Sequence, residues 1–208
     1  MDFYEGTIKL MKYELIDQLS DNGYSSSVCF LAEKSGEKFV FKFPNVTDFT
    51  PKVVLDKKDV ASIRREYEVL KLLRGFPAVS KDVYYSDCCN FSETCDKKCP
   101  RSYSPLFLIK VYVPGYELVD RRKIKTENSL DLKNLVLSLH EKGYAGLDLA
   151  WPGNVIVDFN GMLWVVDLGS ATRIGEKFDD GKRTRLVDRA FFAELRKNDL
   201  SDLARVCV

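Results

Sequence analysis

The alternation of hydrophobic and polar positions divides the first half of the chain into strand-like and helix-like segments. Residues 26–33 (SSVCFLAE) and 37–44 (EKFVFKFP) are rich in β-forming side chains and flank the turn sequence KSGE, which predicts a β-hairpin. Residues 58–75 carry apolar side chains at spacings of three and four, which predicts an amphipathic helix that ends at Gly75. Residues 105–118 (PLFLIKVYVPGYEL) follow as a predicted buried strand that ends at Pro-Gly.

The second half of the chain repeats these patterns in a different order. Residues 129–143 have a helical period and end at a glycine. Two short strand-like segments, 154–159 and 162–168, flank the turn NG, and residues 185–206 are again helical in period. There is neither an internal repeat nor a low-complexity linker. The order of elements predicts an α+β fold.

We expect this fold to be one domain made of two small lobes. The N-terminal lobe is predicted over residues 1–110, with an inserted Cys- and Ser-rich loop at 86–104. A reduced, truncated helical C-terminal lobe is predicted over residues 111–208. The length of 208 residues suits a single domain, and 45% hydrophobic residues are enough for a sizeable core.

Charge and hydropathy narrow the classes of function. A formal net charge of +1 favours neither nucleic acid nor an anionic membrane surface as a partner. The apolar runs are too short to span a bilayer, and the first residues lack the basic-then-apolar pattern of a signal peptide. We therefore expect a cytoplasmic protein with no nucleic-acid or membrane partner, and we favour a monomer.

Four of the six cysteines lie close together in the inserted loop. Cys88, Cys89, Cys95 and Cys99 supply the number of thiols that a structural zinc site uses. They do not form two CxxC pairs, however, and adjacent cysteines rarely bind the same ion. A disulfide is disfavoured in reducing cytosol. We expect an exposed insertion with free thiols and keep a zinc site as the alternative.

The chemistry-bearing residues lie in AGLDLAWPGNVIVD (145–158) and in the LWVVDLGSA that follows. Asp148 and Asn154 lie on a short loop, and Asp167 ends the second strand of the predicted hairpin. Mg²⁺ prefers hard oxygen ligands and is usually held by one or two side chains together with substrate phosphates. Asn154 and Asp167 would hold such an ion, which leaves Asp148 to orient a hydroxyl and accept its proton. Phosphoryl transfer from ATP requires this division of roles.

At these positions the chain resembles the protein-kinase superfamily, and the resemblance continues in order along most of the chain. LDLAWPGN is similar to the catalytic loop, which implies Asp148 as catalytic base and Asn154 as a metal ligand. DLG at 167–169 is similar to the metal-binding DFG segment. FVFKF is similar to the third strand, whose lysine, here Lys42, binds the α- and β-phosphates. RREYEVL is similar to the helix whose glutamate, here Glu66, pairs with that lysine.

Two more segments resemble nucleotide-binding parts of a kinase. LIKVYVPGYEL is similar to the hinge strand, which implies that the backbone from Val111 to Val113 contacts adenine, and it puts Lys110 near the gatekeeper position without a role. DNGYSSSV is similar to the phosphate-covering loop and keeps one of its three glycines. Here the resemblance implies nucleotide contacts at the following residues: Gly23, Ser26 and Val28.

The sequence also departs from the kinase pattern. Gly146 and Leu147 replace the His-Arg before the catalytic Asp, so a phosphorylated activation loop would have no arginine to bind. The catalytic loop has one extra residue, Trp151 or a neighbour, so it must bulge there if Asn154 is to be a ligand. Each motif alone is common, but five in the right order are not.

Small kinases of this kind fall into two groups. Bacterial lipopolysaccharide-core kinases phosphorylate sugars, whereas bacterial type III effector kinases act inside host cells. Some plant-pathogen effectors phosphorylate the heat-shock protein 90 chaperone. The second resemblance implies a serine/threonine kinase that uses ATP and Mg²⁺ on a protein, with a eukaryotic heat-shock chaperone as a candidate, in the cytoplasm or after secretion into a host cytosol. A sugar or small-molecule kinase and a nucleotide-binding pseudokinase are the alternatives.

Overall fold

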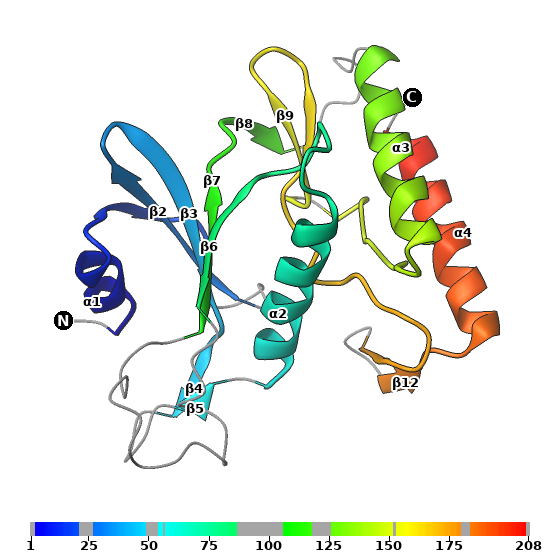
Figure 1. Ribbon diagram of the computed structural model, residues 1–208, viewed down its shortest axis with the longest axis horizontal. Coiled ribbons are helices and arrows are strands. Elements are labelled where there is room, and N and C mark those ends of the chain that lie inside the picture. The colour runs from blue at the N-terminus through cyan, green and yellow to red at the C-terminus, as the bar shows by residue number, and fades with distance from the viewer. Residues whose placement is uncertain are drawn as a thin grey trace. The chain divides into compact units, whose positions relative to one another are not determined.

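The computed structural model describes residues 3–20, 27–48, 54–55, 57–86, 106–117, 126–151, 153–179 and 184–206. The chain divides into two compact units (Figure 1). The N-terminal unit consists of Met1–Tyr67 and Lys81–Tyr112, and the C-terminal unit of Glu68–Ser80 and Val113–Val208. The boundary after Tyr112 lies close to the one expected from the sequence, but residues 68–80 belong to the C-terminal unit.

The N-terminal unit is built on an antiparallel sheet with strand order β1-β2-β3-β7-β6. A second, small sheet pairs β4 with β5. The elements up to residue 112 are α1 (Phe3–Leu10), β1 (Glu14–Gln18), β2 (Val28–Lys34), β3 (Glu37–Phe43), β4 (Val46–Asp48), β5 (Val54–Leu55), α2 (Lys57–Leu72), β6 (Asp82–Ser86) and β7 (Phe107–Val111). The predicted hairpin and the predicted helix at 58–75 are thus β2–β3 and α2.

The turn between β2 and β3 sets the register of the sheet. Lys34 pairs with Glu37, which leaves a turn of two residues, Ser35 and Gly36, with φ of 56° and 81°. Two consecutive left-handed residues match the right-handed twist of the flanking strands. The pairing then runs without a shift as far as Val28.

One face of this sheet carries an aromatic core. Successive residues of a strand point to opposite faces, and alternate positions of β2, β3 and β7 supply buried apolar side chains. The core contains Val28, Phe30, Ala32, Phe39, Phe41, Phe43, Phe107 and Ile109 of the sheet, with Tyr4, Ile8 and Tyr13 from the N-terminal segment. The ring centroids of Tyr4 and Phe43 lie 5.2 Å apart, within the range of favourable aromatic pairs.

Helix α1 was not predicted from the sequence. It has eight residues and contains Gly6, and both features weaken a helix in isolation. Tyr4 and Ile8, four positions apart, place their side chains on one face of the helix and bury them in the aromatic core. Tertiary packing therefore stabilises a helix that local propensity does not favour.

The C-terminal unit combines short strands with two longer helices. Its elements after residue 112 are β8 (Gly115–Glu117), α3 (Thr126–Glu141), β9 (Val155–Asp158), β10 (Leu163–Val165), β11 (Lys177–Asp179), β12 (Thr184–Leu186) and α4 (Arg189–Val206). The sheet order is β10-β9-β8, and β11 pairs with β12. Helices α3 and α4 lie side by side (Figure 1). No helix in the described parts of the chain is long and apolar enough to cross a membrane.

Two predicted elements have different bounds in the structure. The strand expected over 105–118 is two strands in different sheets, β7 and β8, because Pro114 interrupts the backbone donors. Gly115 fits there because a Cβ would lie 2.2 Å from the carbonyl oxygen of Val157. The helix expected over 185–206 begins only at Arg189. Asp188 caps it by accepting the backbone N–H of Phe191 at 2.8 Å, and β12 precedes the cap.

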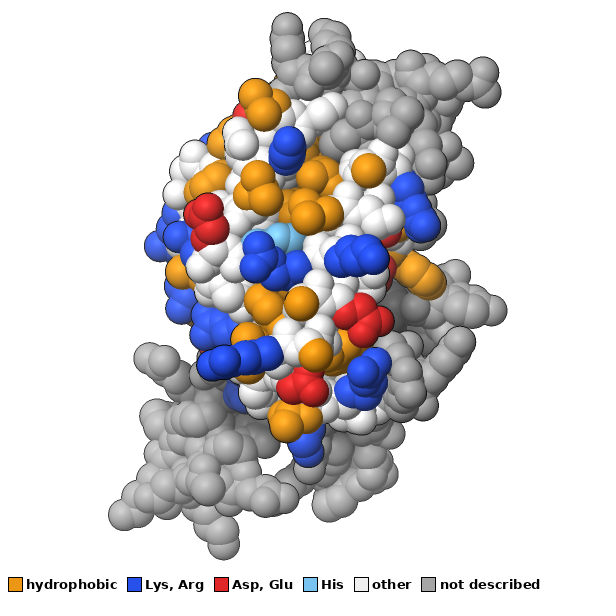
Figure 2. All heavy atoms as spheres, turned by 90° about the vertical axis from the view of Figure 1, so that its right-hand side faces the viewer, with side chains coloured by type: hydrophobic (Ala, Val, Ile, Leu, Met, Phe, Trp, Pro, Cys, Tyr) orange, Lys and Arg blue, Asp and Glu red, His pale blue; other side chains and the backbone are white. Residues whose placement is uncertain are grey.

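Helix α4 has one buried side and one polar side. Its buried residues are Phe191, Phe192, Leu195, Asp199, Leu203 and Val206. The opposite side is exposed and includes Glu194, Arg196 and Lys197. Figure 2 shows the face toward α3 and α4, where basic side chains alternate with scattered hydrophobic ones. Most of the surface of α4 away from the core is thus suited to solvent.

Candidate active site

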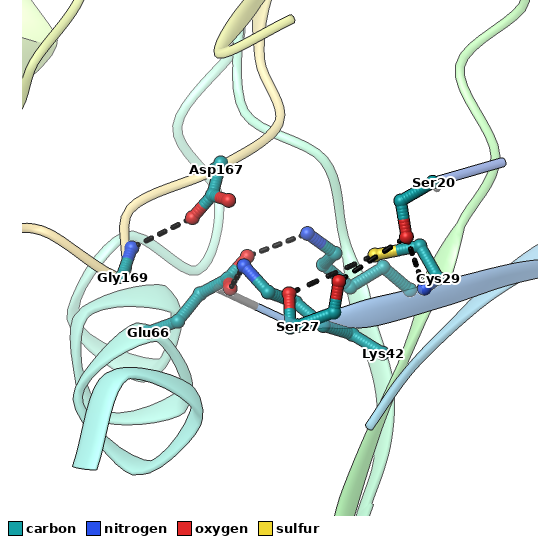
Figure 3. Close-up of polar contacts among 8 residues, drawn as sticks. Ser20, Ser27, Cys29, Lys42, Glu66, Asp167 and Gly169 are labelled. Atoms are coloured by element: carbon teal, nitrogen blue, oxygen red, sulfur yellow. Dashed lines mark hydrogen bonds and ion pairs between the residues drawn. The ribbon is translucent and has the colours of Figure 1, made fainter. Parts of the chain in front are cut away.

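In the N-terminal unit, Lys42 and Glu66 form a buried ion pair (Figure 3). Lys42 projects from β3 on the face opposite the aromatic core, and its Nζ donates to Oε2 of Glu66 at 2.8 Å. The two residues are 1% and 0% exposed. Helix α2 brings the carboxylate there because buried Ile63 and Leu70, three and four positions away, share its face. The structure therefore brings together the lysine and glutamate that the kinase resemblance pairs.

Lys110 is a third member of this group. Its Nζ donates to the other oxygen of Glu66, Oε1, at 2.5 Å, and the residue is 5% exposed. Lys110 lies on β7, next to β3 in the sheet. Sequence reasoning gave it no role, because nothing in the local pattern reveals a partner that is distant along the chain. We call Lys42, Glu66 and Lys110 the lysine–glutamate triad.

The start of β2 differs from the prediction made for the phosphate-covering loop. Val28, expected to contact the nucleotide, lies in the aromatic core, on the face opposite Lys42. Cys29 pairs directly with Lys42 in the β2–β3 register and therefore shares its face. The Cys29 N–H donates to Ser20 Oγ at 2.8 Å, which holds the beginning of the strand (Figure 3). Cys29, and not Val28, therefore lies on the same face of the sheet as Lys42.

The other predicted nucleotide contacts lie partly outside the described residues and partly in the segment from Val111 to Val113. Gly23 and Ser26 lie outside the described residues, as do the four cysteines of the inserted loop. The backbone N–H of Val111 donates to the carbonyl of Lys81 at 2.9 Å, and Val113 is buried. The contact of this segment with adenine stays a prediction.

In the C-terminal unit, the loop from Asp148 to Asn154 closes on itself. The carbonyl oxygen of Asp148 accepts the N–H of Trp151 at 3.2 Å and the side-chain Nδ2 of Asn154 at 2.9 Å. Asn154 N donates in turn to Trp151 O at 3.2 Å, and Gly153 has φ of 87°. Two successive turns therefore absorb the extra residue, and Asn154 still reaches the backbone of Asp148.

Asn154 and Asp167 have the donor atoms that Mg²⁺ prefers. The Asn154 amide group gives its N–H₂ to Asp148, which turns its Oδ1 away from that bond. The carbonyl of Asn154 accepts the N–H of Val166, the neighbour of Asp167, at 2.9 Å, and Asp167 Oδ1 accepts Gly169 N–H at 2.8 Å. Within the described ranges, no three His, Cys, Asp or Glu side chains form a metal site by themselves. These two residues fit an ion that is held mainly by phosphate oxygens.

Asp148 lies in a negative environment. Its backbone has φ of 53°, a strained value for a residue with a side chain, which the packed surroundings must hold. Partial burial raises the pKa of its carboxyl group, and the charges of Asp202, Asp167 and Asp199 raise the pKa further. We call these four residues the acidic cluster. A carboxylate with a raised pKa is a better proton acceptor than an ordinary aspartate.

Helix α4 holds the backbone before and after Asp148. Asp199, 1% exposed, accepts the N–H groups of Gly146 at 2.9 Å and Leu147 at 2.7 Å, and it also accepts Nε2–H of His140 at 2.8 Å. Asp202 accepts the N–H of Ala150, while burial raises the pKa of its carboxyl group.

Sequence reasoning missed Asp199 and Asp202. The available signal was the position of Asp199 four residues after Leu195 and four before Leu203, inside the apolar stripe of the helix. An acidic residue in such a stripe needs partners, because burying a lone charge is costly.

Comparison with known proteins identifies the fold. No protein-family model matches the chain. Among solved structures, the kinase PK-1 of Cydia pomonella granulovirus superimposes with a TM-score of 0.54 at 20% sequence identity, covering 84% of this chain and 60% of that one. The chain has a protein-kinase-like fold. The α+β, two-lobed kinase-like architecture expected from the sequence is therefore confirmed.

Sequence comparison agrees with this fold. The chain is 24% identical to the Citron Rho-interacting kinase of Mus musculus over 226 residues, and 24% identical to the Rattus norvegicus protein over 227 residues. Each alignment covers 86% of this chain and 11% of the relative's length. These similarities support a place in the protein-kinase-like superfamily. The narrower resemblance to bacterial effector kinases stays a prediction.

Proposed function

We propose that the protein is an ATP- and Mg²⁺-dependent kinase that transfers the γ-phosphoryl group to a serine or threonine hydroxyl of a protein. The observation that carries this proposal is the buried Lys42–Glu66 ion pair in a kinase-like fold. Two buried charges are costly to maintain, and a protein that only binds partners has no need of them. The kinase names of the relatives support the same reaction class.

The proposal gives each group one task. Lys42, oriented by Glu66, binds the α- and β-phosphates, and Asn154 and Asp167 hold the metal ion. Bound Mg²⁺ would neutralise the charge on the phosphate oxygens. Asp148 orients the acceptor hydroxyl and takes its proton, which its raised pKa favours. Most of the rate enhancement would then come from positioning and electrostatic stabilisation.

The backbone before Asp148 bears on regulation. Gly146 and Leu147 stand where protein kinases have His-Arg, and both N–H groups donate to Asp199. The loop thus has a backbone anchor but no arginine to bind a phosphorylated residue. We propose that the enzyme works without phosphorylation of its own activation segment.

The proposed substrate follows from the resemblances of the chain. A protein acceptor follows from the kinases that the chain resembles, and a eukaryotic heat-shock chaperone follows only from the narrower resemblance to plant-pathogen effectors. The same resemblance carries the proposals of a bacterial effector role and of action in a host cytosol. A sugar acceptor is the alternative, because a reduced helical lobe offers little platform for a peptide.

The first test is phosphoryl transfer by the purified chain. It would be incubated with Mg²⁺ and γ-labelled ATP, alone and with eukaryotic or bacterial lysate. Asp167→Ala serves as the inactive variant. Asp131→Asn, which removes the charge of an aspartate of α3 that has no role in the proposed scheme, serves as the matched control. We expect a labelled protein band that disappears with Asp167→Ala and persists with Asp131→Asn.

Other results would redirect the proposal. Label only in the small-molecule or lipid fraction would favour a sugar kinase. No label, together with ATP binding seen as a thermal shift, would favour a pseudokinase. Equal activity of Asp167→Ala and the unchanged chain would contradict the metal assignment.

A further inference from the structure

We propose that Lys110 is a positioning residue: it holds Glu66 against the sheet, so that Lys42 can turn its ammonium group to phosphate while helix α2 keeps its place. This inference rests on the proposed kinase function. It assigns a role to a buried charged residue that the reaction scheme above does not use.

The geometry of the triad carries the inference. Glu66 presents one oxygen to each lysine, with Oε2 2.8 Å from Lys42 Nζ and Oε1 2.5 Å from Lys110 Nζ. In the β3–β7 register, Lys42 pairs with Leu108 and Val40 pairs with Lys110. The two lysines are therefore diagonal neighbours on one face of the sheet. They hold the carboxylate between two adjacent strands.

Burial makes the second lysine important. In a simple Lys–Glu pair, a phosphate that attracts the ammonium group competes directly with the carboxylate. A buried carboxylate that loses its only cation is strongly destabilising. In the triad, Lys110 keeps Glu66 paired whatever Lys42 does.

The triad also bears on control of activity. Protein kinases need both the strand lysine and the helix glutamate in place, and regulation commonly acts by moving that helix. Here β7 supplies a second attachment for Glu66, from within the same unit. Helix α2 would then stay in its productive position without a partner protein or a phosphorylation event.

A kinetic double-mutant cycle between Lys110 and Glu66 tests this role. Lys110→Met removes the charge and keeps the side-chain length, and Lys38→Met, an exposed lysine of β3, is the matched control. We expect Lys110→Met to lower kcat/KM for ATP about tenfold, mostly through kcat, and Lys110→Arg to restore part of the loss. In a Glu66→Gln background, Lys110→Met should change kcat/KM less than twofold.

Hydrogen exchange in the nucleotide-free protein provides a readout that does not need activity. We expect Lys110→Met to speed exchange of the α2 amides at least tenfold relative to Lys38→Met. If the chain transfers no phosphate but α2 exchange responds in this way, the proposed function fails and the attachment of α2 by Lys110 stands.

Two results would overturn the inference. One is a loss of activity in Lys110→Met that is equally large with and without the Glu66 carboxylate, because Lys110 would then not act through Glu66. The other is an altered KM for ATP, or an altered preference between ATP and GTP, with α2 exchange unchanged. That result would make Lys110 a nucleotide contact instead.

Discussion

The lysine–glutamate triad of the N-terminal unit and the acidic cluster of the C-terminal unit are both groups of charges, but they differ in sign and in balance. In the triad, opposite charges meet at hydrogen-bond distance in a fully buried setting. In the acidic cluster, like charges crowd together, and partial burial followed by these charges raises the pKa of Asp148. In the triad the Glu66 carboxylate has a lysine at each oxygen, whereas the carboxylates of the acidic cluster raise the pKa of Asp148. We expect the first group to hold a fixed position, and we propose that Asp167 and Asp148 of the second serve metal binding and proton transfer.

The largest expected effect comes from the acidic cluster and concerns rate alone. Asp167→Asn should lower phosphoryl transfer on the order of a hundred- to a thousandfold, because the proposed metal ligand would lose its charge. The free energy of unfolding should not fall, since the amide can still accept Gly169 N–H and the repulsion with Asp148 disappears. Steady-state kinetics and urea denaturation, with Asp131→Asn as control, measure both quantities. A variant that loses stability along with activity would contradict the view that this cluster serves function rather than folding.

In the triad, by contrast, we expect substitution to lower the stability of the fold. Glu66→Gln leaves two buried ammonium groups around a neutral amide, so we expect a loss of about 3–5 kcal/mol in the free energy of unfolding. Glu68→Gln, on the exposed side of the same helix, is the control and should change little. Urea denaturation at neutral pH measures the difference. If both variants unfold at the same urea concentration, the triad does not stabilise the unit.

Asp199 refines the comparison, because it belongs to the acidic cluster by charge and to the folding core by its contacts. Asp199→Asn should destabilise the chain by about 2–3 kcal/mol, since one amide cannot accept from two backbone N–H groups and an imidazole together. Phosphoryl transfer should fall as well, because the backbone before Asp148 loses its anchor. Thermal unfolding of this variant beside Glu194→Gln, an exposed site on the same helix, tests the prediction. Unchanged stability would place Asp199 with the functional carboxylates.

The smallest expected effect is a gain in stability. The pKa of Asp148 is raised in the folded chain, so folding disfavours its ionised form. This penalty is complete above the raised pKa and absent only below the ordinary pKa of an aspartate. Asp148→Asn should therefore stabilise the protein at pH 7 in metal-free buffer by less than about 1 kcal/mol, while phosphoryl transfer is lost. The gain should shrink as the pH falls through the raised pKa of Asp148 and vanish below the ordinary pKa of an aspartate, because the carboxyl group is then neutral in the folded and the unfolded chain. Denaturation curves of Asp148→Asn and the unchanged protein at pH 7 and at acid pH measure the difference in the free energy of unfolding. A lower free energy of unfolding for Asp148→Asn at pH 7 would contradict the prediction.

The elements that depend on local sequence pattern could be predicted from the sequence. The β2–β3 hairpin, α2 and the order of the kinase-like motifs follow from periodicity, turn residues and spacing. Local pattern could not reveal α1, because packing of Tyr4 and Ile8 stabilises it. It also could not give the partner of Lys110, which is 44 residues away from Glu66 along the chain.

The position of Val28 on the face opposite Lys42 has a simple geometric origin. Strand side chains alternate between faces, so a motif shifted by one residue names the wrong face. The motif at 21–28 had lost two of its glycines, and this left the register undetermined at the sequence level. The structure resolves it through the pairing of Cys29 with Lys42.

The turn of Ser35 and Gly36 has a consequence for how this protein can vary. Surface turns usually tolerate insertions and deletions, and this one is exposed. Yet one residue added or removed there, with the hairpin re-paired to match, would exchange the two faces of a strand. Lys42 would then point into the aromatic core and Phe41 or Phe43 would take its place. We expect close relatives that keep this reaction to preserve the length of the turn more strictly than its amino acids.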